Sequence, residues 1–340
     1  MKRRARTVIS YLCIIAIILL VSALLIISVG SSVQKSLASF IRGIAGSFYG
    51  FSEVLVRSTP LILAGLGVGM GFRTGFINIG AEGQLYMGAI AVTALGMAAP
   101  GLPAIVMIPL ALVLGFAFGG IWSFIPGILK AKFGISEVLN TIMFNYIAIN
   151  LVGILVRTSL KDTSYPYPMS PMLPKATYLF QLFPPNRVHA GFLIALVLAV
   201  LMYILLFKTW TGFGMRAVGL NSRACRCAGI SVFKNLALSS VISGGLAGIA
   251  GVCEVSGLHH RLLEGISPSY GYLAIIVALL GGNHPLWIVV SALGISALQV
   301  GSMAMQRSAG VPTSIASIIM GLIVVLILAR KQLFTIEKEA

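Results

Sequence analysis

The sequence predicts an all-α, polytopic membrane protein with about ten transmembrane helices. Of its 340 residues, 58% are hydrophobic and only 9% are charged, whereas a soluble domain of this size carries about 25% charged residues. Apolar runs near 20 residues long also recur along the chain, and about 20 residues of helix cross the hydrocarbon core of a bilayer. These observations exclude a water-soluble enzyme, a secreted module and a disordered tail.

The first predicted span covers residues 8–29. Its apolar run is longer than the roughly 7 to 15 residues of a signal peptide core. Four basic residues precede it: Lys2, Arg3, Arg4 and Arg6. We therefore expect a cytoplasmic N-terminus, followed by an external stretch over residues 30–52.

The core of a single transmembrane domain, residues 1–340, is predicted over residues 53–329. Its apolar segments are 53–72, 84–98, 103–125, 136–156, 189–207, 236–255, 270–281, 286–305 and 312–329. With the first span they make ten, so both termini are expected in the cytoplasm.

Two of these segments look too short or too broken for full spans, namely 53–72, which contains Pro60 and several glycines, and 270–281. Interrupted helices in corresponding positions of two halves indicate a midplane pathway in transporters. Similar spacing in "GFINIGAEGQLYMGAI" and "GISPSYGYLAIIVALLGG" suggests a weak internal repeat. Close packing of glycine-rich helices is the alternative explanation.

The net charge of +16 does not indicate a nucleic-acid binder, because the basic residues are spread between the apolar runs. Our topology places 15 of the 24 Lys and Arg residues on the cytoplasmic side. This agrees with the rule that basic residues near the ends of spans are retained in the cytoplasm. Residues 208–234 form the most basic cytoplasmic loop. The external loop, residues 157–188, is rich in proline and aromatic residues and is either a semi-rigid docking surface or disordered.

Polar residues gather in the stretch "GFRTGFINIGAEGQ", residues 71–84. An ionisable side chain at membrane depth is costly unless it is paired or hydrated, so Glu82 is a functional candidate. Alternatively, Glu82 pairs with Arg73 and only fixes a turn. Asn78 and Gln84 are the neighbouring candidates for a solute pathway.

A second polar stretch is "SEVLNTIMFNY", residues 136–146. Ser136 is expected to cap a helix, with Glu137 near the positive end of the helix dipole. Asn140, Thr141 and Asn145 form a polar strip on an otherwise apolar helix. That strip faces either another helix or a polar solute.

Within loop 208–234, the letters "NSRACRCAGI" predict a short helix that Asn221 or Ser222 caps and Gly229 ends. Such a helix could serve as a lever for a soluble partner, although anionic lipid headgroups are an alternative partner for Arg216, Arg223 and Arg226. The pair Cys225-x-Cys227 lacks a second ligand pair for zinc, and we expect neither a metal ion nor a cofactor.

Four motifs in this order carry a resemblance: "GFINIGAEGQLYMGA", "SEVLNTIMFNYIA", "MRAVGLNSRACRCAGI" and "ALLGGNHPL". From about Leu61 to Leu328 the chain resembles the permease subunits of bacterial ATP-binding-cassette importers for simple sugars and nucleosides, relatives of the ribose and branched-chain amino-acid permeases. It is most similar to the branch that works with basic-membrane-protein-type binding lipoproteins. Cys225, Cys227 and the pair Tyr272-Leu273 depart from the usual pattern.

The resemblance implies a type II importer-like permease of the bacterial cytoplasmic membrane that moves a nucleoside or simple sugar by alternating access. It implies three partners: an ATPase subunit of the tandem kind, a second permease that is unlike or identical, and an extracytoplasmic binding lipoprotein. No G-x-x-x-x-G-K-[ST] phosphate loop is present, so ATP hydrolysis is expected in a separate subunit. Residues expected to couple to the ATPase are Arg216, Gly219, Asn221, Arg223 and Gly229.

Two other functions remain to be weighed. A secondary transporter driven by an ion gradient would use Glu82 or Glu254 to carry a proton or sodium ion. A membrane enzyme is disfavoured, because the four histidines are scattered and none lies at metal-ligand spacing with an acid.

Overall fold

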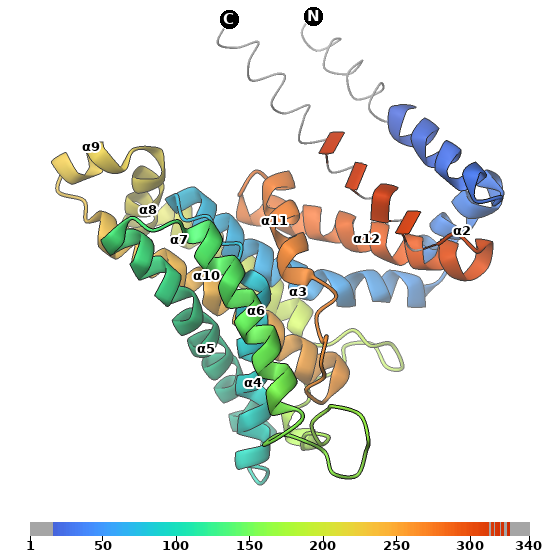
Figure 1. Cartoon of the computed structure of the whole chain (residues 1–340), viewed down its shortest axis with the longest axis horizontal. Helices are drawn as coiled ribbons and strands as arrows, with labels where there is room; N and C mark the ends of the chain where they lie inside the picture. The colour runs from blue at the N-terminus through green and yellow to red at the C-terminus, as the bar shows by residue number, and fades with distance from the viewer. Residues whose placement is uncertain (1–15, 313, 316, 320, 323–324, 327–340) are drawn as a thin grey trace, which may run out of the picture. The chain divides into compact units, whose positions relative to one another are not determined.

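The computed structural model describes residues 16–312, 314–315, 317–319, 321–322 and 325–326. The described part is helical, with no strand beyond two isolated bridges (Figure 1). Among the described residues, six helices are long and apolar enough to cross a membrane, or seven if one bent pair is a single span. The chain is therefore an all-α protein with several candidate spans. Residues 8–15 of the first predicted span, and eight of the 18 residues of the predicted segment 312–329, fall outside the described residues.

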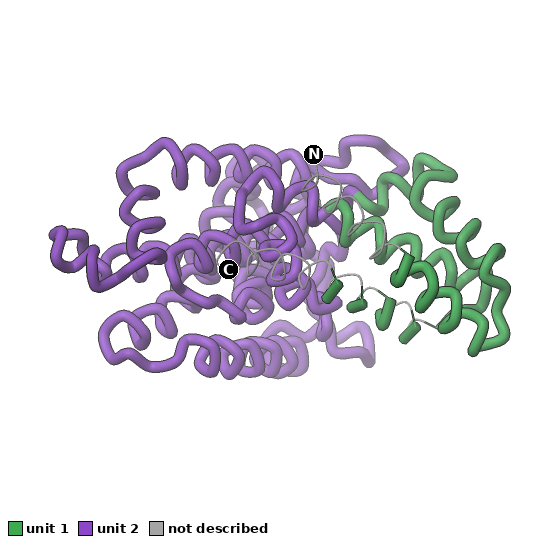
Figure 2. The backbone as a smooth tube through the Cα atoms, turned by 90° about the horizontal axis from the view of Figure 1, so that it is seen from above, with its two compact units in different colours: residues 1–54, 293–340 green, residues 55–292 purple. Residues whose placement is uncertain are grey.

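The chain divides into two compact units, residues 1–54 with 293–340 and residues 55–292 (Figure 2). In the first unit, helix Ala16–Ser28 is followed by α2 (Val33–Ala45), bent by 114° from it. Ser32 caps α2 by accepting the N–H of Lys35. The stretch 30–52, predicted to be external, is thus mostly helical, formed by α2 and the start of α3 (Phe48–Thr74).

The second unit contains α4 (Ala81–Ala98), α5 (Ala104–Phe133), α6 (Glu137–Leu155), α7 (Gly191–Lys208), α8 (Trp210–Leu220), α9 (Ser222–Cys227), α10 (Val232–Glu254) and α11 (Tyr270–Leu280). The boundaries between the two units fall within two long helices, α3 (Phe48–Thr74) and α12 (Pro285–Ala309). A π-helical turn, η2 (Val255–His259), extends α10, and a 3-10 turn, η1 (Lys175–Thr177), lies in the loop 157–188.

Helix α10 is the hub of the second unit and packs on α4 and α5. Glycines on both helices allow the backbones of α10 and α5 to touch, since a Cβ on Gly248 would overlap the carbonyl of Gly115 and one on Gly119 would overlap that of Gly244. In the span 232–259, 78% of the most apolar window is buried, against 28% in α5, α6 and α7. The span 232–259 is therefore mostly buried, whereas α5, α6 and α7 expose most of their apolar windows.

Helix α3 corrects the expectation that residues 53–72 are too broken for a full span. It is continuous over 27 residues and includes Pro60. Its glycines lie against neighbours in the second unit, Gly65 against Val277 and Ile288, and Gly67 against the backbone of Ser243. Close packing outweighs the weak helix propensity of glycine and proline. The short segment 270–281 is confirmed as the 11-residue helix α11.

Candidate functional site

A break in the helices lies between α3 and α4. Residues 75–80, here called the broken segment, have no helical structure, although the helices on either side are buried. Gly75 turns the chain with a φ of +81°, and the N–H of Phe76 donates to the carbonyl of Gly71 at 2.9 Å. Because the broken segment lacks the hydrogen bonds of a helix, its backbone N–H and C=O groups need other partners.

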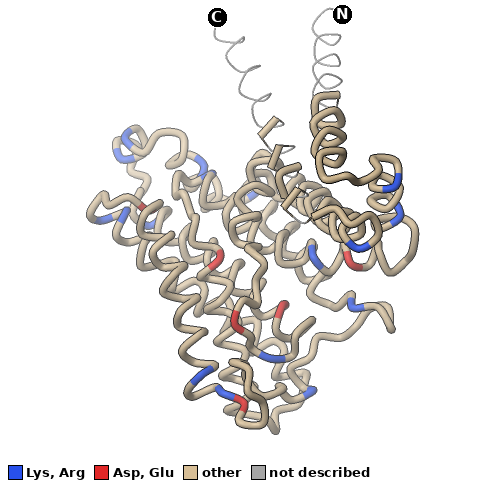
Figure 3. Tube along the Cα trace, turned by 45° about the vertical axis from the view of Figure 1, so that its right-hand side comes forward, with Lys and Arg blue, Asp and Glu red and all other residues tan. Residues whose placement is uncertain are grey.

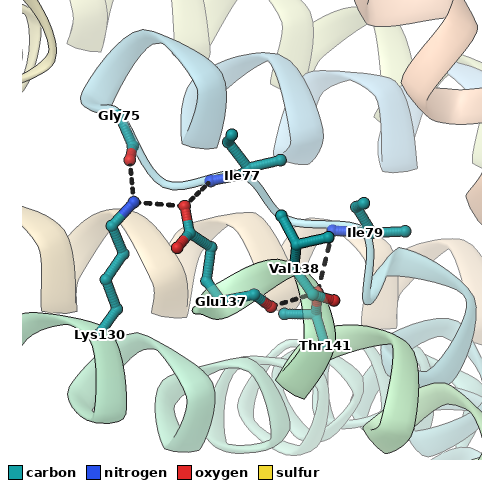
Figure 4. A network of polar contacts seen from close by, with 7 residues as sticks. All are labelled: Gly75, Ile77, Ile79, Lys130, Glu137, Val138 and Thr141. Atoms are coloured by element: carbon teal, nitrogen blue, oxygen red, sulfur yellow. Dashed lines mark hydrogen bonds and ion pairs between the residues drawn. The ribbon is translucent and has the colours of Figure 1, made fainter. Parts of the chain in front are cut away.

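Helix α6 supplies those partners from one face (Figure 4). Glu137 accepts the N–H of Ile77 at 3.2 Å, and Thr141 accepts the N–H of Ile79 at 3.3 Å. Asn145 donates to the carbonyl of Ile79 at 2.9 Å. The three side chains are spaced by four residues, so they lie along one side of the helix. The predicted polar strip thus faces the broken segment through Thr141 and Asn145.

Lys130, which the sequence analysis did not single out, completes this network. Gly134 has a φ of +68° and ends α5, and the tight turn brings the last turn of α5 beside the first turn of α6. Lys130 therefore forms an ion pair with Glu137 and donates to the carbonyl of Gly75 (Figure 4). The predicted cap is not formed: Ser136 makes no side-chain capping bond at the start of α6. Glu137 instead binds Lys130 and the N–H of Ile77.

Asn78 and Gln84 form a buried amide pair. The amide of Asn78 donates to Gln84 Oε1 at 2.8 Å, and that of Gln84 returns a bond to Asn78 Oδ1 at 3.0 Å. Asn78 also donates to the hydroxyl of Ser243 on α10 and accepts the N–H of Gly80, both at 2.8 Å. The amide pair therefore joins the broken segment to α4 and α10.

Glu82 connects the first turn of α4 with α11. Its Oε2 accepts the N–H of Gly271 at 2.7 Å, and a Cβ on Gly271 would overlap the backbone of Glu82. Asn145 reaches the same place, accepting the N–H of Gly83 at 2.8 Å and donating to the hydroxyl of Tyr272 at 3.3 Å. The two stretches compared above as a repeat are thus in contact.

The alternative pairing of Glu82 with Arg73 is wrong. Arg73 donates instead to the carbonyls of Asn283 at 2.5 Å and Gly282 at 3.3 Å. A guanidinium satisfies carbonyls at the end of a helix well, because the dipole leaves partial negative charge there.

The candidate pathway residues are almost all satisfied within the chain. Five of them are buried and hydrogen-bonded: Asn78, Glu82, Gln84, Thr141 and Asn145. Asn140 is different, because its amide nitrogen is buried and has no partner among the described residues.

The predicted short helix is α9. Asn221 caps it by accepting the N–H groups of Arg223 at 3.0 Å and Ala224 at 3.1 Å, and Gly229 follows it with a φ of +77°. Helix α8 (Trp210–Leu220) before it was not predicted; Thr209 caps it, because its hydroxyl accepts the N–H of Gly212 at 3.1 Å.

The α8–α9 pair rests on the broken segment. Phe76, fully buried, packs in one apolar cluster with residues of α8, α9 and α10, namely Val218, Cys225, Val232 and Leu236. Gly219 lies against the backbone of Arg73 and Thr74, where a Cβ would overlap a carbonyl. A displacement of α9 would therefore act directly on Phe76, while Arg223 and Arg226 remain exposed.

The loop 157–188 is ordered against η2 and the residue that follows it. The N–H of Leu179 donates to the carbonyl of Ser256 and that of Leu173 to the carbonyl of His260, both at 2.9 Å. In the same region, buried Glu254 lies 3.6 Å from the imidazole of His259. The loop 157–188 thus offers a folded surface.

Comparison with known proteins identifies several relatives. Residues 50–328 match the family described as the permease component of the branched-chain amino acid transport system. The chain is 39% identical to the guanosine ABC transporter permease protein NupP of Bacillus subtilis, over 92% of this chain and 91% of that protein. It is 32% identical to the nucleoside ABC transporter permease protein NupB of Lactococcus lactis, over 95% and 91%. It is 33% identical to the glucose ABC transporter permease protein TsgB13 of Haloferax volcanii, over 83% and 77%. No solved structure matches at a significant level.

Proposed function

Since the chain belongs to the family of permease components of branched-chain amino acid transport systems, we propose that it is the membrane-spanning subunit of an ATP-driven importer whose cargo is a nucleoside. The observation that carries this cargo is the 39% identity with a guanosine permease over more than nine-tenths of both chains. A second relative with similar coverage is also a nucleoside permease. The glucose permease relative makes a simple sugar the competing cargo.

The solute would pass beside the broken segment by alternating access. Five of the candidate pathway residues already bind one another or the backbone, so we assign them the role of holding this segment in shape. Asn140 retains a free amide donor among the described residues, which suits a hydrogen bond to a passing solute or to a partner permease. Weak contacts suffice if an external binding protein supplies the affinity.

Helix α9 is the proposed docking element for the ATPase subunit. Support comes from the Asn221 cap, which fixes its start, and from the exposed cations Arg223 and Arg226. Gly219 and Gly229 permit the close approach and the turn on either side. The buried contact with Phe76 would pass a movement of α9 to the pathway.

The finer architecture is part of the same proposal. It comprises about ten spans with a weak internal repeat, both termini in the cytoplasm, a second permease that is unlike or identical, and a binding lipoprotein docked on loop 157–188. The backbone hydrogen bonds that hold this loop against η2 support its role as a docking surface.

The test is uptake into proteoliposomes that contain this chain with its partner subunits. We expect uptake of labelled guanosine that requires ATP, is inhibited by unlabelled nucleosides and resists excess glucose. ATP-dependent uptake of glucose alone would overturn the cargo but keep the importer. Guanosine uptake driven by a sodium or proton gradient without ATP would overturn the importer in favour of a secondary transporter.

A further inference from the structure

Two arginines from distant parts of the chain share one aromatic ring. The guanidinium of Arg73 lies 5.0 Å from the ring centre of Phe207, and that of Arg216 lies 5.1 Å from the same centre. We call Arg73 and Arg216 the arginine pair. Each cation gains from the ring, but the two charges repel each other. An anion between or beside them would remove that repulsion.

Within the described part of the chain, neither member of the arginine pair forms an ion pair with a carboxylate. The ion pairs found there include those of Lys130 with Glu137, Arg157 with Glu264 and His259 with Glu254. Around the α8–α9 end of the second unit, Lys and Arg are more frequent than Asp and Glu (Figure 3). The counter-charge must therefore come from outside the described part of the chain.

Unsatisfied donors point to a ligand at this place. The Nε of Arg216 is buried and has no hydrogen-bond partner among the described residues. The Nδ1 of His284 is buried and unpaired in the same way, and its ring lies 5.1 Å from that of Phe207. Buried polar atoms without partners are uncommon and call for an explanation. A ligand with several acceptor oxygens would satisfy Arg216 Nε, and also His284 Nδ1 in the tautomer or charged form that carries a proton there.

The cluster lies where candidate spans end. Arg73 is in the last turn of α3, Phe207 is in the last turn of α7, and His284 directly precedes α12. If these helices cross the bilayer, the arginine pair is at the depth of lipid headgroups rather than beyond them.

An exposed apolar stripe on α7 leads to the same ring. Val197, Val200 and Ile204 are 58%, 49% and 44% exposed, and with Phe207 they follow the three- and four-residue spacing of one helix face. An acyl chain lying along this stripe would bring its headgroup to the arginine pair. This continuity favours a lipid over a protein partner.

We propose that Arg73, Arg216 and His284 form a site for the phosphate group of an anionic phospholipid such as phosphatidylglycerol. Guanidinium groups bind phosphate oxygens through paired hydrogen bonds, and basic pockets between cytoplasmic span ends suit anionic headgroups. The proposal separates Arg216 from the ATPase-docking residues, leaving Arg223 and Arg226 on exposed α9 for that role. It does not depend on the transported cargo.

The test uses the delipidated complex of this chain with its partner subunits, titrated with phosphatidylglycerol, phosphatidylcholine or inorganic phosphate. Bound lipid is counted by native mass spectrometry. We expect retention of phosphatidylglycerol over phosphatidylcholine, and about a fivefold loss of that preference in Arg216→Gln, the effect of one cation near a charged headgroup. The matched control is Lys132→Gln, which removes an exposed cation lying over a single ring, that of Phe133, and should leave the preference unchanged.

The remaining outcomes decide between sources of the anion. If inorganic phosphate displaces phosphatidylglycerol at millimolar concentration and in an Arg216-dependent way, the oxyanion site stands but its ligand is free phosphate. If Arg216→Gln leaves lipid retention unchanged, or lowers only capture of the ATPase subunit, the proposal is overturned. Should Arg216→Gln fail to assemble, Arg216→Lys keeps the charge but not the planar fork, and an unaltered lipid preference there would count against paired guanidinium bonding.

Discussion

The side-chain amide of Asn145 on α6 donates to the backbone carbonyl of Ile79 at 2.9 Å, although 66 residues separate the two along the chain. The same side chain accepts the N–H of Gly83 at 2.8 Å. One buried residue thus holds both the broken segment and the first turn of α4. Its replacement should therefore disturb the broken segment at Ile79 and the start of α4 at Gly83.

We expect Asn145→Leu to destabilise the protein by about 1–3 kcal/mol for each buried backbone group left unpaired. Leucine keeps the number of side-chain heavy atoms and the branch at Cγ but removes the donor and the acceptor. The free energy of unfolding is measured by denaturant titration in mixed micelles. Asn150→Leu is the control, because Asn150 is exposed and donates only within its own helix, to the carbonyl of Tyr146. Equal losses in the two variants would contradict the assigned role.

The ion pair between Lys130 and Glu137 should contribute more than an exposed one. Its side chains retain 24% and 10% of their exposure, against 55% and 45% in the pair of Arg157 and Glu264. Exposed pairs contribute about 0.2–1 kcal/mol, whereas removing one member of a buried pair costs several times more. We expect Glu137→Gln to lower stability well beyond Glu264→Gln.

A double-mutant cycle isolates the pair itself. The single variants Lys130→Met and Glu137→Gln are compared with the double variant by the same unfolding titration. A coupling energy within the range of exposed pairs would show that the network in Figure 4 adds no special stability.

The close contact at Gly271 predicts a steric block between α11 and α4. A Cβ there would meet backbone atoms of Glu82, which cannot move aside like a flexible side chain. We expect Gly271→Ala to cost about 1–3 kcal/mol, as overpacking does, and to slow uptake. Gly294→Ala on α12 is the control, since nothing lies within 4 Å of its Cβ position. If Gly271→Ala behaves like Gly294→Ala in uptake and in unfolding, the backbone contact is not important.

Much of the helical framework follows from the sequence, because apolar runs need no knowledge of their neighbours. The stretches around Asn78 and Asn145 could also be singled out, since amides are rare in such apolar surroundings. Their partners could not be predicted, because Ile79 and Asn145 meet only through packing of α4 against α6. Pro60 was misleading for the same reason: its local preference for a break is outweighed by the packing of α3. The cluster of Arg73, Phe207, Arg216 and His284 lay beyond prediction, because its members come from three separate span ends and from α8.

Phe76 provides the last prediction, because it is the one fully buried side chain of the broken segment that packs against α8 and α9. If α9 receives a push from an ATPase subunit, Phe76 must transmit it to Ile77 and Ile79, which α6 holds through Glu137 and Thr141. We expect Phe76→Leu, which keeps an apolar side chain but removes the ring, to lower uptake per ATP hydrolysed while binding of the ATPase subunit persists. The ratio is measured in proteoliposomes from labelled nucleoside and released phosphate. Phe133→Leu, at an exposed site in the last turn of α5, should leave the ratio unchanged. A proportional fall of uptake and hydrolysis in Phe76→Leu would instead mean that the cluster supports assembly and not transmission.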